Sequence, residues 1–193
     1  MSDFTDSNNS DKAKYETLKD CDTIRTIMTS DGQQFSVQTN HLIISKLIFV
    51  MLDESDIDAE DNIPVPAVNS KNFEKIVEFM KMYHENPMKE IEKPLRSNNL
   101  KDIVQECYAD LINIEEEEEL FSLIMASNYL DIQPLLNLGC AKVASMIKGK
   151  SPEEIRKIFD IGTEDENSES TEKITESTEE NEINNDKIPE TAN

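Results

Sequence analysis

The sequence predicts an α+β fold in which a small β-sheet is flanked by helices, and three patterns support this prediction. β-branched residues alternate with other residues before a Ser-Asp-Gly turn at 30–32, which is typical of a β-hairpin. From residue 39 onward, apolar residues recur every three or four positions in several segments, which is typical of amphipathic helices. Both ends of the chain are polar and rich in acidic residues, which favours disorder there.

The first half of the chain holds the expected sheet. Residues 1–22 are predicted to be disordered because they contain few apolar anchors. The hairpin strands carry their alternating residues at Ile24, Thr26, Met28, Phe35 and Val37. A helix capped by Thr39 or Asn40 follows, and because it is apolar on more than one face, we expect it to be deeply buried or shared with a partner. After an acidic loop at 53–62, the segment IPVPAV at 63–68 is expected at a sheet edge, because its prolines cannot donate to a central ladder.

The second half is predicted to be helical. An amphipathic helix begins after the cap Asn69 and ends before Pro87, and a loop covers 85–103. The acidic run 115–119 is expected in the first turn of another helix, where the macrodipole favours negative charge. Three apolar stripes mark the remaining helices: Leu120, Leu123 and Ile124; Leu135, Leu136, Cys140, Val143, Ala144 and Ile147; and Ile155, Ile158 and Phe159. We expect Cys140 to be a small buried hydrophobe.

The joint between the last two helices has a strong local signal. Gly149 suits the left-handed position that follows a helix. Ser151 is a favoured N-cap, Pro152 follows it at the first helical position, and Glu154 completes a capping box. Each feature stabilises by about 0.5–2 kcal/mol at most, and together they predict where one helix ends and the next begins.

Composition excludes several classes of partner. The 193 residues suffice for one domain with extensions. Forty-one acidic residues against nineteen basic ones give a net charge of −22, which disfavours a nucleic-acid groove and binding to an anionic membrane surface. Residues 164–193 alone hold eleven acids and two lysines. No apolar run reaches the ~18 residues of a membrane span, and the N-terminus lacks the features of a signal or transit peptide.

The sequence contains little that indicates catalysis. Three cysteines without a C-x-x-C pair favour reduced thiols in the cytosol or nucleus. The two histidines lie far apart, so a zinc site would need ligands gathered from distant segments. No glycine-rich phosphate loop or nucleophile motif occurs, and no cofactor is expected. Cys107 and His84 could form a nucleophile pair on paper, but an ordinary core or half-exposed cysteine is the favoured interpretation.

What remains for function is apolar surface. The stripes at 135–147 and 155–159 belong to short helices near the C-terminus. They either pack on the body of their own domain or provide part of a groove for a partner's helices. Periodicity favours neither of these alternatives over the other.

The segment SNYLDIQPLLNLGCAKVASMIKGKSPEEIRKIFDI at 127–161 is similar to the helical half of the Skp family, the S-phase kinase-associated adaptors of cullin–RING ubiquitin ligases. Weaker agreement occurs in SDGQQFSV, in VMLDE and in IPVPAVNSKNFEKIVEFMKMYHENP, so the resemblance covers residues 23–161. It implies a BTB/POZ fold at 23–133 with additional C-terminal F-box-binding helices at 134–161. Around these parts lie the disordered segment 1–22 and the disordered acidic tail 162–193.

The resemblance also implies partners. In this family the BTB body binds the N-terminal domain of a cullin, the C-terminal helices bind the F-box of a substrate receptor, and the adaptor itself is not an enzyme. On this basis we expect Asn128 and Tyr129 to contact the cullin. The residues expected to contact the F-box are Val143, Ile147, Ile155, Ile158 and Phe159. A weak homodimer of the free protein is left open, because BTB relatives often pair.

Departures from the family pattern leave a second hypothesis. Tyr108 stands where the family usually has a tryptophan. The family's terminal helix, which contains a further tryptophan, is replaced here by an acidic tail. The first hypothesis is an adaptor between F-box proteins and a cullin, in the cytoplasm or nucleus. The alternative is a divergent relative that binds only one of the two partners, as a decoy or as a subunit of a different complex. An enzyme of unknown type is the third hypothesis.

Overall fold

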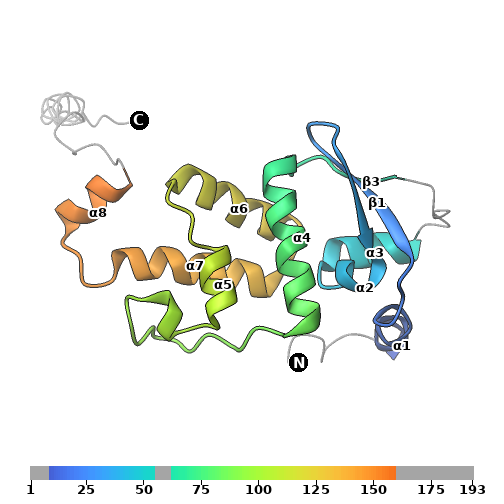
Figure 1. The fold of residues 1–193 in the computed structure, drawn as a ribbon, viewed down its shortest axis with the longest axis horizontal. Helices are drawn as coiled ribbons and strands as arrows, with labels where there is room; N and C mark the ends of the chain where they lie inside the picture. Colours follow the sequence, from blue (N-terminus) through green and yellow to red (C-terminus); the bar gives the residue numbers. More distant parts are fainter. Residues whose placement is uncertain (1–8, 55–61, 160–193) are drawn as a thin grey trace, which may run out of the picture. The chain divides into compact units, whose positions relative to one another are not determined.

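The computed structural model describes residues 9–54 and 62–159 (Figure 1). The chain divides into two compact units, one up to Lys150 and one from Ser151, and each is described by itself. The expected acidic tail at 162–193 lies outside the described residues, as do most of the acidic loop and residues 1–8.

A three-stranded sheet forms as the hairpin pattern predicts. β1 (Ile24–Thr29) pairs antiparallel with β2 (Gln34–Gln38) and parallel with β3 (Asn62–Val65), in the order β2-β1-β3. Gly32 in the turn has a φ of 77°, a conformation that glycine adopts without a steric penalty. β3 lies at the edge of the sheet and contains Pro64, so the prediction of an edge strand from its prolines is confirmed.

A helix precedes the sheet, in a segment that the sequence predicts to be disordered. Within residues 1–22, α1 (Asn9–Leu18) is helical, so the prediction is wrong for this stretch. The Lys14 ammonium lies 4.0 Å from the centroid of the Phe49 ring and donates to the Phe49 carbonyl oxygen. This cation–π contact with a residue far along the chain helps to stabilise a segment whose own composition is too polar to suggest order.

The single helix expected after the hairpin is two helices, α2 (Thr39–Leu42) and α3 (Lys46–Glu54). The N-cap of α2 is Gln38, and neither Thr39 nor Asn40 holds that position. The Thr39 Oγ1 instead donates to the Thr23 carbonyl at 2.8 Å. Ser45 lies at the break and is buried. Its Oγ accepts a hydrogen bond from the Ile48 amide at 3.2 Å, so the break supplies a local cap for α3.

The next helix, α4 (Ser70–Glu85), begins as predicted. The Asn69 side chain accepts a hydrogen bond from the Asn72 amide at 2.8 Å, which confirms the cap. The inner face of α4 buries Phe73, Ile76, Val77, Phe79 and Met80. A short 3-10 helix, η1 (Leu100–Asp102), interrupts the long loop and precedes α5 (Glu106–Leu111).

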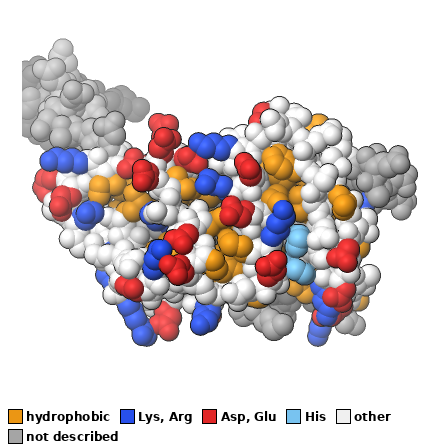
Figure 2. All heavy atoms as spheres, viewed as in Figure 1, with side chains coloured by type: hydrophobic (Ala, Val, Ile, Leu, Met, Phe, Trp, Pro, Cys, Tyr) orange, Lys and Arg blue, Asp and Glu red, His pale blue; other side chains and the backbone are white. Residues whose placement is uncertain are grey.

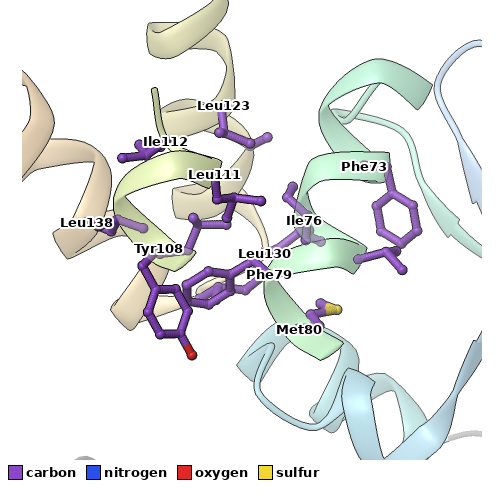
Figure 3. Close-up of a cluster of buried hydrophobic side chains, with 14 of the residues drawn as sticks. Phe73, Ile76, Phe79, Met80, Tyr108, Leu111, Ile112, Leu123, Leu130 and Leu138 are labelled. Atoms are coloured by element: carbon purple, nitrogen blue, oxygen red, sulfur yellow. The ribbon is translucent and has the colours of Figure 1, made fainter. Parts of the chain in front are cut away.

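Tyr108 of α5 is fully buried in this core (Figure 3). Its ring lies 5.5 Å from that of Phe79, centroid to centroid, and its hydroxyl donates to the Asn86 carbonyl at 2.6 Å. Burial raises the pKa of the Tyr108 phenol well above its usual value. Tyr108, which stands where the resemblance implies a tryptophan, is thus a satisfied core residue.

The remaining helices are α6 (Glu117–Tyr129), α7 (Gln133–Ile147) and α8 (Pro152–Ile158). α6 and α7 pack against each other (Figure 1). The acidic run lies at the N-terminus of α6 as predicted, but only Glu117, Glu118 and Glu119 are in its first turn; Glu116 is the N-cap and Glu115 precedes the helix. One hydrophobic core joins the sheet to α4, α5, α6 and α7, so the predicted α+β fold is confirmed.

Candidate functional site

Helix α6 has two apolar faces with different surroundings. One face buries Leu120, Leu123, Ala126 and Ser127. The other presents Phe121, Met125 and Tyr129 at a spacing of four residues, with 42%, 66% and 37% of each residue exposed. We call these three residues the α6 stripe. Large apolar side chains that share one helix face in solvent mark an interaction surface.

The two residues expected to contact a cullin lie at the C-terminal end of this stripe. Asn128 and Tyr129 are both exposed in the last turn of α6. The turn that follows contains Asp131, which has a positive φ of 50°. A non-glycine residue in that conformation needs support from its neighbours.

Support for this turn comes from α3, far away in sequence. The buried Ser45 hydroxyl donates to the Leu130 carbonyl at 2.6 Å, and the Lys46 amide donates to the Asp131 carbonyl at 3.3 Å. These bonds hold the end of α6 on the body of the domain. The position of Tyr129 is therefore determined by the body and not by α6 alone.

Helix α7 buries a face that agrees only in part with the predicted stripe, since Leu135 is buried as expected and Val143 packs against the core. Leu135, Leu138 and Ala141 are buried, whereas Cys140 is exposed, so the expectation of a buried Cys140 is wrong. The helix is apolar over a wide arc, and contact with α6 selects the row spaced by three residues instead of the row that contains Cys140. The two expected F-box residues of α7 are both half-buried: Val143 packs against the core, and Ile147 lies in the last turn.

Gly139 lets α6 and α7 approach each other closely. A Cβ atom placed on Gly139 would lie 2.5 Å from Cγ1 of Ile124, which no real side chain tolerates without movement. A side chain at this position would therefore force Ile124 or the helix packing to shift. The sequence did not reveal this role, because a helical glycine needed for close packing has the same local pattern as one that is merely tolerated.

The joint before α8 has the predicted chemistry. Gly149 has a φ of 76°. The Ser151 Oγ accepts from the Glu154 amide at 3.3 Å, and the Ser151 amide donates to a Glu154 carboxylate oxygen at 2.8 Å. The capping box is thus confirmed. The other three expected F-box residues belong to this second unit and are all half-buried: Ile155, Ile158 and Phe159.

The two residues of the candidate nucleophile pair, Cys107 and His84, lie on separate helices, α5 and α4. Cys107 is exposed on α5, while the His84 ring lies against His41. Within residues 9–54 and 62–159, three or more His, Cys, Asp or Glu side chains nowhere gather in a way that could hold a metal ion. Over the same residues, every helix is too short or too polar to cross a membrane.

The α6 stripe is not recognisable from the sequence as a surface. Its spacing of four residues is visible in the chain, but that spacing is equally typical of a core face. Only the burial of Leu120 and Leu123 on the opposite side shows that Phe121 and Met125 are left outside. Ser45 gives no signal at all, because it lies within a predicted continuous helix.

Two domain models of one protein family match the chain. The Skp1 POZ model, described as "Skp1 family, tetramerisation domain", matches residues 24–85. A second model, described as "Skp1 family, dimerisation domain", matches residues 133–187. The first match covers the sheet and helices α2, α3 and α4, and it confirms the POZ fold that the resemblance implied.

Individual relatives agree with these matches. The chain is 47% identical over 117 residues to an S-phase kinase-associated protein 1 homolog of Tetrahymena thermophila, covering 61% of this chain and 69% of the relative. It is 38% identical over 136 residues to the E3 ubiquitin ligase complex SCF subunit sconC of Arthroderma otae, covering 70% and 81%. It is 39% identical over 135 residues to SKP1-like protein 11 of Arabidopsis thaliana, covering 70% and 82%. The chain belongs to the Skp1 family.

Proposed function

We propose that the protein is a non-catalytic adaptor subunit of a cullin–RING E3 ubiquitin ligase, which bridges an F-box substrate receptor to the cullin scaffold. Similarity to relatives named as SCF ubiquitin ligase subunits supports this function. The structural observation that carries it is the α6 stripe, where large apolar side chains are exposed on a helix whose other face is core. An adaptor needs such preformed surfaces and no catalytic group.

At the level of residues, we propose two binding surfaces. Asn128 and Tyr129 contact the cullin N-terminal domain, and their exposure at the end of α6 supports this role. The F-box is held by Val143 and Ile147 of α7 and by Ile155, Ile158 and Phe159 after the joint. Half-burial of these five residues supports the role, because each retains apolar surface that a partner can cover.

The division of the chain follows from these roles. We propose a BTB/POZ body at 23–133 and F-box-binding helices at 134–161, with a cytoplasmic or nuclear location. A weak homodimer of the free protein is part of the proposal, and the exposed apolar side chains of the α6 stripe support it.

A second candidate is a divergent adaptor that binds only one of the two partners. The observation that favours it is the absence of tryptophan from the whole sequence, since aromatic anchors of that size often dominate an interface. Under this alternative, the protein acts as a decoy or in a complex other than a ligase.

One binding experiment separates the two candidates. The full chain is immobilised and titrated with a cullin N-terminal domain and, separately, with an F-box peptide, both by biolayer interferometry. Binding of both supports the adaptor, binding of one supports the alternative, and binding of neither contradicts both candidates. Circular dichroism of the same protein sample confirms that the chain is folded, so that a lack of binding cannot be attributed to unfolding.

Two substitutions assign the surfaces. Tyr129→Lys places a charge in the cullin surface and should abolish cullin binding without loss of the fold, whereas Ile155→Asp should weaken F-box binding by burying an unpaired carboxylate. Glu78→Gln, at an exposed position of α4, makes the same change in net charge as Tyr129→Lys and is its control. Ile155→Leu is the control for Ile155→Asp. Unchanged affinity in either test variant would remove that residue from its proposed surface.

A further inference from the structure

The two histidines of the chain meet on the surface of the first unit. His41 lies in α2 and His84 in the last turn of α4. Their ring centroids are 5.0 Å apart and the rings make an angle of 75°. Figure 2 shows them as an adjacent pale blue pair on one face. Forty-three positions separate them in the sequence, so only packing of α2 on α4 brings them together.

The two rings have different surroundings. His84 is exposed, whereas His41 is half-buried. The Nδ1 atom of His41 is shielded from solvent and has no hydrogen-bond partner among the described residues. A buried ring nitrogen without a partner is tolerated more easily in a neutral imidazole than in a cation, whose charge would have to be desolvated.

Charged groups of both signs surround His41. Burial is the main cause that lowers the pKa of His41 below its usual 6.5, and the neighbouring His84 and then Lys81 act in the same direction. Glu85 and Asp22 act in the opposite direction but do not overcome these effects. The folded protein therefore holds His41 in its neutral form more firmly than the unfolded chain does.

We propose that the contact between His41 and His84 is an acid-sensitive latch between α2 and α4, closed while the His41 imidazole is neutral and weakened when that imidazole takes up a proton. The contribution of neutral His41 to the stability of the fold is complete above pH 6.5, where the His41 ring is neutral in both the folded and the unfolded chain. It is lost as the pH falls below that value, because the unfolded chain then binds a proton that the folded chain resists. The latch does not depend on the proposed adaptor function.

Titration of the ring tests the latch directly. Proton–carbon NMR of the full chain follows the two imidazoles from about pH 8 to about pH 5, and single variants assign the signals. We expect the pKa of His41 to lie below 6.5 and to move upward in His84→Gln, where the neighbouring charge is removed. Titration of His41 at or above 6.5, or no movement in the variant, overturns the proposal.

A stability measurement tests the consequence. Thermal unfolding of the wild type and of His84→Gln is compared over the same range, so that the effect of the many carboxylates cancels between the two proteins. We expect the midpoint of the wild type to fall in acid by about 2–4 °C more than that of the variant. His41→Gln should show the same shallower dependence, whatever its absolute stability. Identical dependence on pH in all three proteins overturns the latch.

Discussion

Helices α4 and α6 pack against each other in the same body, yet they use their apolar residues in opposite ways. α4 turns its large side chains inward, and its outer face is polar, with Lys71, Glu74 and Glu78 exposed. α6 buries one apolar row and exposes another. α4 therefore contributes its apolar residues to the core alone, whereas α6 contributes one apolar row to the core and leaves a second row exposed.

Specific polar contacts join the N-terminal halves of the two helices. The Asn72 side-chain amide donates to the Ser122 hydroxyl at 2.7 Å, and the Lys71 ammonium lies 2.9 Å from a Glu119 carboxylate oxygen. Asn72 is buried, so its bond to α6 also satisfies a polar group inside the protein. The difference between the helices therefore does not arise from separate locations in the molecule.

The largest expected effect separates a core phenylalanine from a surface one. Phe79→Ala should lower the free energy of unfolding by about 3–5 kcal/mol, because it opens a cavity beside Tyr108. Phe121→Ala, its counterpart in the α6 stripe, should cost only about 0.5 kcal/mol. Urea unfolding of both variants measures the difference. Equal losses would contradict the distinction between the two helices.

A smaller effect is expected where α6 meets α7. Gly139→Val should destabilise by about 1–3 kcal/mol, because its side chain would overlap Ile124. The matched control is Cys140→Val, which places the same side chain on the exposed neighbouring position and should be nearly neutral. Guanidinium unfolding compares the two variants, and a neutral Gly139→Val would show that the helices can separate without cost.

The smallest effect concerns how the two helices begin. The Ser70 amide at the start of α4 donates to Asp31 at 3.1 Å, whereas the N-cap of α6, Glu116, makes no capping bond through its side chain. Hydrogen bonds from Ser70 and then Thr29 lower the pKa of Asp31 from 3.8 to about 2.

Asp31→Asn should therefore remove a stabilisation that depends on pH. With its pKa lowered in the folded state, the Asp31 carboxylate stabilises fully above pH 3.8, and this contribution fades as the pH falls toward about 2. We expect the variant to be slightly less stable than wild type near neutrality and equally stable in strong acid. Circular dichroism of thermal unfolding across this range compares the variant with wild type, and parallel curves for the two proteins would contradict the stabilisation by the Asp31 carboxylate.

The sequence by itself determined the features that depend on near neighbours. The hairpin turn at Gly32, the cap Asn69 and the capping box from Ser151 to Glu154 all form as predicted. Each rests on atoms within a few residues of one another, so the local residue types contain the necessary information. Membership of the family likewise follows from the chain itself, because the long segment at 127–161 carries the resemblance in its order of residues.

Tertiary structure alone decided which surfaces meet. The contact between Lys14 and Phe49 stabilises α1, and the predicted helix is interrupted at Ser45. Cys140 is exposed at the surface of α7. Tertiary structure also brought His41 to His84. In each case the outcome depends on residues far apart in the chain, and a helix that is apolar on several sides does not specify which side its neighbours will cover.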